Sequence, residues 1–153
     1  MISLKTILGF GLSFLTMPYV HGADVTVNRS AEITRTLDEG SHTLFLHCTE
    51  KACTVVKTQD NTPVDSVEIS LKTADRILNQ FFEKLPATLD NAEAPSSGAI
   101  LKWEINSGAK THKGYWLRSE FNRKVATDRK KAIDAAASLE NSLSVELLSK
   151  KIK

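Results

Sequence analysis

The chain has 153 residues, of which 41% are hydrophobic and 25% are charged. This composition is that of a soluble globular protein and excludes a wholly disordered chain. The formal net charge of +2 hides an uneven distribution, because residues 23–101 carry 12 acidic and 7 basic side chains whereas residues 102–153 carry 6 and 12. A basic half favours an anionic partner, although the two halves can equally neutralise each other within one fold.

The first 22 residues have the pattern of a secretory signal peptide. Lys5 provides a short positive region, residues 7–15 are apolar, and small residues surround a predicted cleavage site at Gly22 or Ala23. The apolar run is too short to span a bilayer as a helix. We therefore predict a secreted or periplasmic protein without a transmembrane anchor, in which residues 23–153 form a single domain.

Alternating polar and apolar residues predict the first strands of a sheet. Residues 24–28 and 33–37 are short strand candidates, and residues 38–41 form a polar turn. Residues 42–48 and 53–58 form the clearest hairpin, with a four-residue polar loop between them.

The two cysteines, Cys48 and Cys53, lie at the closed end of this hairpin. If they oppose each other, Leu46 opposes Val55, and the cysteine Cβ atoms come close enough for a disulfide. An even number of cysteines in a secreted chain also favours a disulfide. The alternative is a metal or redox site that includes His47, but strand alternation places His47 on the opposite face, so we expect no metal and no cofactor.

The first helix follows a loop and one further strand candidate. Residues 60–65 predict a loop, and residues 66–71 predict a half-buried strand. A helix then runs from a cap at Thr73 to residue 85. Its apolar residues recur at helical spacing and form one stripe. The stripe consists of Ala74, Ile77, Leu78, Phe81, Phe82 and Leu85. We interpret it as core packed on the sheet, with a hydrophobic ligand groove as the alternative.

The second half repeats the order of hairpin and helix. Residues 86–98 contain Pro, Gly and small polar residues and predict a flexible linker inside the domain. Residues 100–106 predict a strand, residues 107–114 a polar loop, and residues 115–118 the return strand.

A long C-terminal helix is expected from residue 120 to about residue 148, either continuous or bent or broken near residues 141–144, and the sequence leaves this choice open. Its stripe consists of Phe121, Val125, Ala132, Ala136, Leu139, Leu143 and Leu147. The pattern therefore predicts an α+β fold: an antiparallel sheet made of two hairpin-plus-helix halves, one disulfide-pinned hairpin and a long C-terminal helix.

Residues 102–131 combine both tryptophans and a tyrosine with 9 basic and 3 acidic residues. Aromatic rings beside Lys and Arg stack on bases or sugars, or bind a protein partner. The predicted binding residues are Trp103, Lys110, Lys113, Tyr115, Trp116, Arg118, Arg123, Lys124, Arg129 and Lys130. The alternative is that Trp103 is core, Trp116 covers a sheet edge and the charges are solvated. No recognised nucleic-acid motif is present.

An enzymatic alternative uses Glu104, His112 and Arg118 from the same hairpin. A carboxylate, a histidine and a cation are the groups that acid–base cleavage of a phosphodiester requires. His112 stands among lysines in the predicted loop, which favours a solvated side chain instead. Serine-triad and P-loop patterns are absent from the sequence.

Residues 107–110, Ser-Gly-Ala-Lys, are followed closely by Gly114-Tyr115. This segment is similar to the Ser-Gly-Ala loop of the periplasmic C-type lysozyme inhibitors. In that family a loop with a serine and a basic residue plugs the hydrolase cleft. The family is a small all-β barrel, whereas this chain has two predicted helices. The resemblance therefore adds inhibition to the functions considered and does not predict the fold.

The leading functional prediction is a secreted or periplasmic, non-enzymatic interaction protein that binds an acidic protein or an anionic polymer. An inhibitor, an immunity protein or a virulence effector would each fit. A small secreted hydrolase or nuclease is the alternative, and a structural periplasmic subunit is a third class.

Overall fold

A computed structural model describes residues 28–150, so the predicted leader, most of the first predicted strand and the last three lysine-rich residues lie outside the described part. The elements in chain order are β1 (Arg29–Leu37), β2 (Gly40–Cys48), β3 (Cys53–Gln59), β4 (Thr62–Ile69), α2 (Leu71–Lys84), β5 (Ala99–Ser107), β6 (Lys110–Leu117), a short 3₁₀ helix (Arg118–Glu120) and α3 (Thr127–Ser149).

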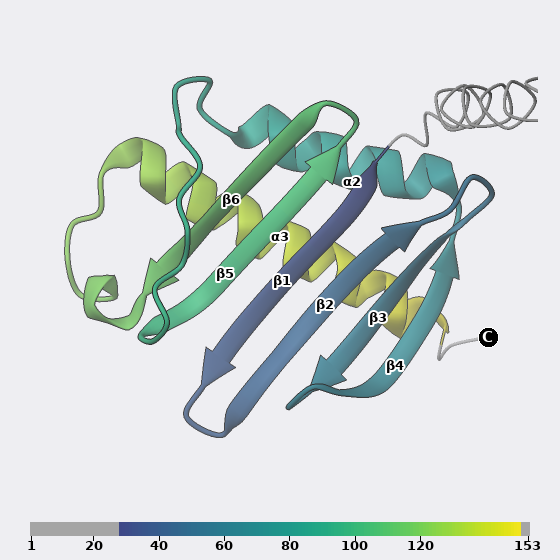
Figure 1. Ribbon diagram of the computed structural model, residues 1–153, viewed down its shortest axis with the longest axis horizontal. Helices are drawn as coiled ribbons and strands as arrows, with labels where there is room; N and C mark the ends of the chain where they lie inside the picture. The colour runs from purple at the N-terminus through teal and green to yellow at the C-terminus, as the bar shows by residue number, and fades with distance from the viewer. Residues whose placement is uncertain (1–27, 151–153) are drawn as a thin grey trace, which may run out of the picture.

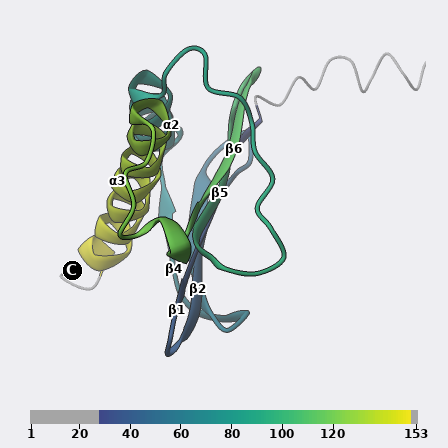
Figure 2. The ribbon, with the colours of Figure 1, turned by 90° about the vertical axis from the view of Figure 1, so that its left-hand side faces the viewer.

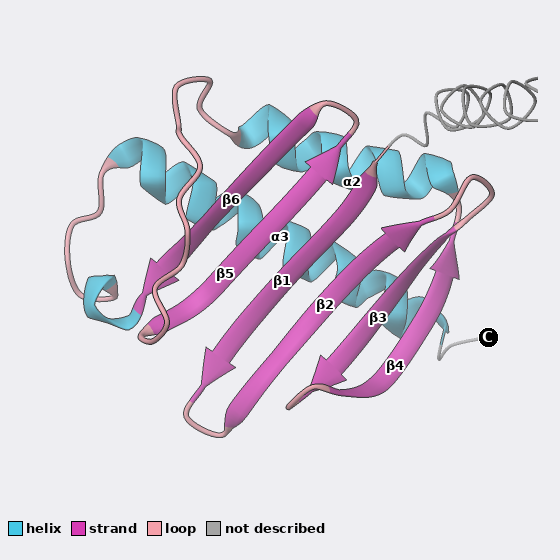
Figure 3. Ribbon diagram, in the orientation of Figure 1, coloured by secondary structure: helices cyan, strands magenta, loops and turns pink. Residues whose placement is uncertain are grey.

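The six strands form one antiparallel sheet in the order β4-β3-β2-β1-β5-β6 (Figures 1 and 3). Helices α2 and α3 both pack on the same face, and no other helix of residues 28–150 covers the opposite face of the sheet (Figure 2). The predicted α+β class, the antiparallel sheet and the long C-terminal helix are confirmed.

The core lies between the sheet and the two helices. Strand alternation sends Ile33, Leu44 and Leu101 toward the helices, where each is almost fully buried. The predicted stripe of α2 meets them through Ile77 and Phe81. Burying an aliphatic or aromatic side chain of this size contributes about 1.5–3 kcal/mol, so the apolar stripe is core and not an open ligand groove.

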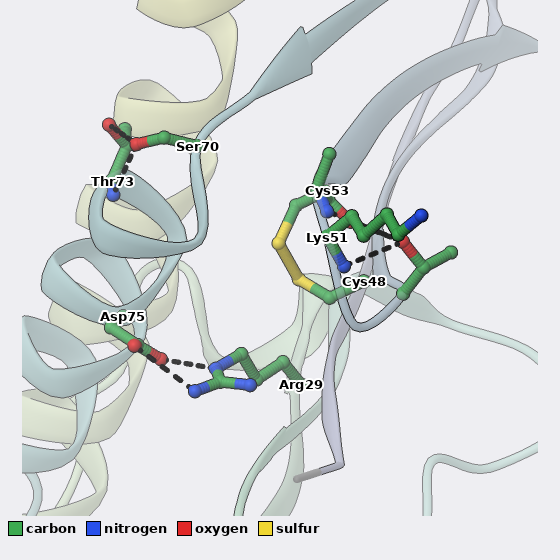
Figure 4. The surroundings of a disulfide bond; sticks show 9 residues. Arg29, Cys48, Lys51, Cys53, Ser70, Thr73 and Asp75 are labelled. Atoms are coloured by element: carbon green, nitrogen blue, oxygen red, sulfur yellow. Dashed lines mark hydrogen bonds and ion pairs between the residues drawn. A yellow bond between two sulfur atoms is a disulfide. The ribbon is translucent and has the colours of Figure 1, made fainter. Parts of the chain in front are cut away.

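The cysteine hairpin has the predicted register. Cys48 opposes Cys53, Leu46 opposes Val55, and the two cysteines form a disulfide (Figure 4). His47 points to the opposite face of the sheet and is exposed. A structural disulfide fits an extracellular or periplasmic protein.

Removing the disulfide with Cys48→Ala/Cys53→Ala is expected to lower the free energy of unfolding by only about 2 kcal/mol, because the bond closes a very short loop. Urea unfolding of the oxidised protein and of the variant measures the difference. Adding a reductant should weaken the wild type by the same amount and leave the variant unchanged. A loss above about 4 kcal/mol would show that the bond does more than hold the hairpin register.

Two strands extend further than the sequence pattern indicated. The predicted loop 60–65 is only a two-residue turn, in which Asp60 and Asn61 both have positive φ, and β4 begins at Thr62. Asp and Asn tolerate this conformation, and an edge strand tolerates Pro63. The predicted loop 107–114 is likewise a turn at Gly108, because β6 begins at Lys110.

Both helices begin at different residues from those predicted. Helix α2 is capped by Ser70, whose Oγ accepts the N–H of Thr73 at 3.1 Å, so Thr73 is not the cap (Figure 4). Helix α3 begins at Thr127 and not at residue 120. It then continues to Ser149 without a break, although Ser142 and Ser144 donate to carbonyls one turn earlier, a bond that often bends a helix.

Three ion pairs connect the helices to the sheet and to each other. Arg29 of β1 binds Asp75 of α2 (Figure 4), and Arg76 of α2 binds Glu146 of α3. The third is the most buried: Glu140 of α3, 8% exposed, accepts hydrogen bonds from Arg35 of β1 and His42 of β2.

None of the helices in residues 28–150 is long and apolar enough to cross a membrane.

The segment 86–98 runs from α2 past β6 to the face of the sheet that carries no helix (Figure 2). It is held there by Lys113 of β6: the Ala92 N–H donates to the Lys113 carbonyl, the Lys113 N–H donates to Asn91 Oδ1, and Lys113 Nζ pairs with Glu93. The segment therefore covers part of the exposed edge of the sheet.

Candidate interaction site at the end of β6

Trp103 is a core residue and not a surface residue. It lies on β5 directly opposite Gly114 of β6, and its indole lies across the glycine, where a Cβ would come within 2.3 Å of the ring. The indole N–H donates to His112 Nδ1 at 3.1 Å, and the two rings are nearly parallel. Trp103 therefore anchors β5 to β6 and is removed from the predicted binding surface.

The three residues of the enzymatic alternative do not converge. Glu104 faces the open side of the sheet and pairs with Lys113. His112 faces the helices, is only 5% exposed, and contacts Phe81 and Trp103. Arg118 lies beyond the end of β6. Burial lowers the pKa of His112, which keeps the imidazole neutral, and the arrangement offers no shared position for a substrate.

Several of the predicted cations are already paired within the chain. Lys113 binds Glu93 and Glu104, Arg118 binds Asp38, Arg129 binds Glu120, and Lys130 binds Asp134. Lys110 lies over the ring of Phe82, at 5.9 Å from its centroid. The basic residues thus point in different directions and do not form one surface.

Where β6 ends, the predicted binding residue Trp116 contacts Phe121, which was not among the predicted binding residues. The ring of Phe121 stacks on Trp116, with centroids 5.4 Å apart and planes 22° apart. Trp116 is packed against the core, whereas Phe121 is 65% exposed. Exposed Arg118, Arg123 and Lys124 flank this pair in the chain. We call Trp116 and Phe121 the aromatic corner.

A clamp of charged and aromatic groups fixes the corner. The Glu120 carboxylate accepts the N–H of Leu117 at 2.9 Å and two hydrogen bonds from the Arg129 guanidinium at 2.8 and 2.9 Å. The guanidinium lies 4.7 Å from the centroid of the Tyr115 ring. Hydrogen bonding to Arg129 lowers the pKa of Glu120, so the carboxylate stays charged well into the acid range. We call Tyr115, Glu120 and Arg129 the clamp.

The clamp also explains why α3 begins late. Glu120 is used to bind Leu117 and Arg129, so the chain turns at residues 118–126 and enters α3 only at Thr127. The predicted Phe121 position of the helical stripe is consequently outside the helix and on the surface. Sequence reasoning missed Glu120, whose partner stands nine residues away across a turn.

A concave region lies on the open face of the sheet, beneath residues 92–94. It is a hollow of about 220 Å³, lined by charges of both signs that include Glu32, Lys102, Glu104 and Lys113. Its charges partly neutralise one another, since Lys113 pairs with Glu104 and with Glu93 at the rim. It therefore presents no single kind of charge to a ligand.

Comparisons with protein-family models, with curated proteins and with solved structures found no match. Residues 107–110 form a tight turn between β5 and β6 in a sheet covered by two helices, which differs from the all-β barrel of the lysozyme inhibitors.

Proposed function

We propose that the protein is a secreted or periplasmic, non-enzymatic interaction protein that binds an acidic protein or an anionic polymer through the aromatic corner and its flanking cations. Inhibitors, immunity proteins and effectors act in this way. The observation that carries the proposal is Phe121, a large ring held exposed on Trp116 beside Arg118, Arg123 and Lys124.

A single exposed apolar side chain is ordinary in a soluble protein, but this one differs in two respects. It is supported by a second aromatic ring and a hydrogen-bonded clamp, so little side-chain and loop entropy remains to be lost on binding. Its neighbours are Arg and Lys, and aromatic residues together with Arg are enriched in interface hot spots. Residues 118–131 carry six basic and two acidic side chains, which favours an acidic partner.

Affinity capture tests the proposal with a charge-matched pair of variants. The oxidised protein is used as bait for soluble material from its native environment, beside Arg123→Glu/Lys124→Glu and the control Lys51→Glu/Lys72→Glu. All four substituted side chains are exposed, and both variants change the net charge equally. We expect the wild type and the control to retain the same partner and the corner variant to retain at least 10-fold less. Equal capture by both variants would contradict the proposal.

A further inference from the structure

The corner also indicates which of the two classes of partner it fits. An anionic polymer binds through many simultaneous contacts between cations and its regularly spaced charges. The free cations of residues 102–131 do not form such a row. Among the cations without a carboxylate partner in the described chain, Lys102 lies on the open face, Lys110 lies over Phe82 on the helix side, Lys131 lies on α3, and Arg123 and Lys124 follow Phe121 in the sequence.

Three of the four aromatic rings in this region are also unsuited to a polymer. Stacking on a base or a sugar requires an accessible ring face. Trp103 is in the core, one face of the Tyr115 ring is covered by Arg129, and Trp116 is covered by Phe121. One ring, that of Phe121, therefore projects alone from a fixed base. A single convex apolar group fits into a pocket and does not form a platform.

The ion pair between Asp38 and Arg118 shows that Arg118 already binds a carboxylate. The Asp38 carboxylate, on the turn between β1 and β2, lies 2.8 Å from the Arg118 guanidinium, and the two side chains are 84% and 58% exposed. An ion pair this exposed contributes little to stability. A carboxylate of a partner can therefore take the place of Asp38 on Arg118 at small cost, while other carboxylates meet Arg123 and Lys124.

We propose that the partner is a folded protein with an apolar pocket rimmed by carboxylates, and that Phe121 enters this pocket while the rim binds Arg118, Arg123 and Lys124. This inference rests on the proposed function and narrows it to a protein partner. Phe121 is the anchor of the interface, and the cations set its orientation and its rate of association.

The test separates the anchor from the charges. Phe121→Ala removes the anchor, and Leu148→Ala is its control, because Leu148 is 57% exposed on the outer side of α3. Asp38→Asn leaves Arg118 without its internal carboxylate. Each protein is used as bait for the same soluble material at low salt and at about 200 mM salt, and direct binding to heparin is measured as the polymer probe.

We expect the wild type to retain a protein at both salt concentrations. Phe121→Ala should retain less of this protein, by a factor of roughly 30 or more. Leu148→Ala should be unchanged. Asp38→Asn should bind a few-fold more tightly at low salt, a gain that a loss of folding cannot produce. Heparin should not compete with the retained protein.

Two results would overturn the inference in distinguishable ways. Direct heparin binding that disappears by about 200 mM salt, depends on Arg123 and Lys124 and is indifferent to Phe121 would identify a polymer partner and leave the proposed function standing. No capture by the wild type at either salt concentration, together with no heparin binding, would contradict both this inference and the proposed function.

Discussion

Gly114→Ala is expected to lower the free energy of unfolding by about 2–3 kcal/mol, a large effect for the addition of one methyl group. The new Cβ would lie 2.3 Å from one carbon of the Trp103 indole and 2.6 Å from another. The indole cannot move aside easily, since it is 5% exposed and its N–H is bonded to His112. Either the ring leaves its position or β6 separates from β5.

A second substitution shows whether the clash is the cause. Trp103→Phe removes the outer ring atoms that a Cβ at position 114 would meet, although the single variant also loses the hydrogen bond to His112. In that background Gly114→Ala should cost at least 1 kcal/mol less than in the wild type, so the two changes are not additive. Chemical unfolding of the four proteins measures this coupling. An equal cost in both backgrounds would mean that the glycine is needed for its backbone and not for the space it leaves.

Gly114 also shows why the sequence pattern does not predict the whole sheet. The hairpin of β2 and β3 was predicted with its register, because its inward positions are apolar and its cysteines fix the alignment. The inward positions of β6 include His112 and Gly114. Neither residue resembles a core residue in the sequence, so the sequence pattern predicts a polar loop there. Their burial depends on Trp103, which comes from another strand.

The candidate site was predictable only in part for a related reason. The sequence directs attention to residues 102–131, because aromatic and basic residues concentrate there. It does not reveal that Lys113, Arg118 and Arg129 are paired, since their carboxylates come from a linker, a distant turn and the far side of a bend. It also does not reveal that the final helix begins after Phe121, because the cause is the non-local bond between Glu120 and Arg129.

The ion pairs between the sheet and α3 are likewise not predictable from the sequence. Glu140 stands 98 residues from His42 and 105 from Arg35, and no local pattern relates them. In the sequence Glu140 is one more polar residue on an amphipathic helix. Only the packing of α3 across β1 and β2 shows that it is a buried carboxylate with two partners.

The second large expected effect is a loss of folding stability in acid. The free energy of unfolding is expected to fall as the pH is lowered from 7 to 5, chiefly because of His112. Its Nδ1 accepts the Trp103 N–H, and its Nε2 is buried without a hydrogen-bond partner in residues 28–150. A protonated ring would direct a second N–H at the indole N–H. Burial accordingly lowers the pKa of His112 below the ordinary value of 6.5.

The direction of the effect follows from the protons bound in each state. The unfolded chain takes up a proton at His112 near pH 6.5, whereas the folded chain does so only at lower pH. The contribution of the neutral imidazole is therefore complete above about pH 6.5 and is lost as the pH falls toward the folded pKa. One such group changes the free energy of unfolding by at most about 1.4 kcal/mol per pH unit.

The pH range from 7 to 5 isolates this residue from Glu140. Burial by itself raises the pKa of the Glu140 carboxyl, but the hydrogen bonds from Arg35 and His42 outweigh burial and lower it overall. A lowered carboxyl pKa stabilises the fold above about pH 4.5, and that contribution is lost only as the pH falls through the folded value. Unfolding measured at pH 5 and above therefore retains the Glu140 contribution in full.

Two histidine variants distinguish the cause. His112→Phe should be less stable than the wild type at pH 7 by about 1–3 kcal/mol, because the Trp103 N–H loses its acceptor, yet its stability should change little between pH 7 and 5. His47→Gln should keep the wild-type slope, because His47 is exposed on the opposite face. If His112→Phe keeps the full slope, the acid sensitivity does not come from His112.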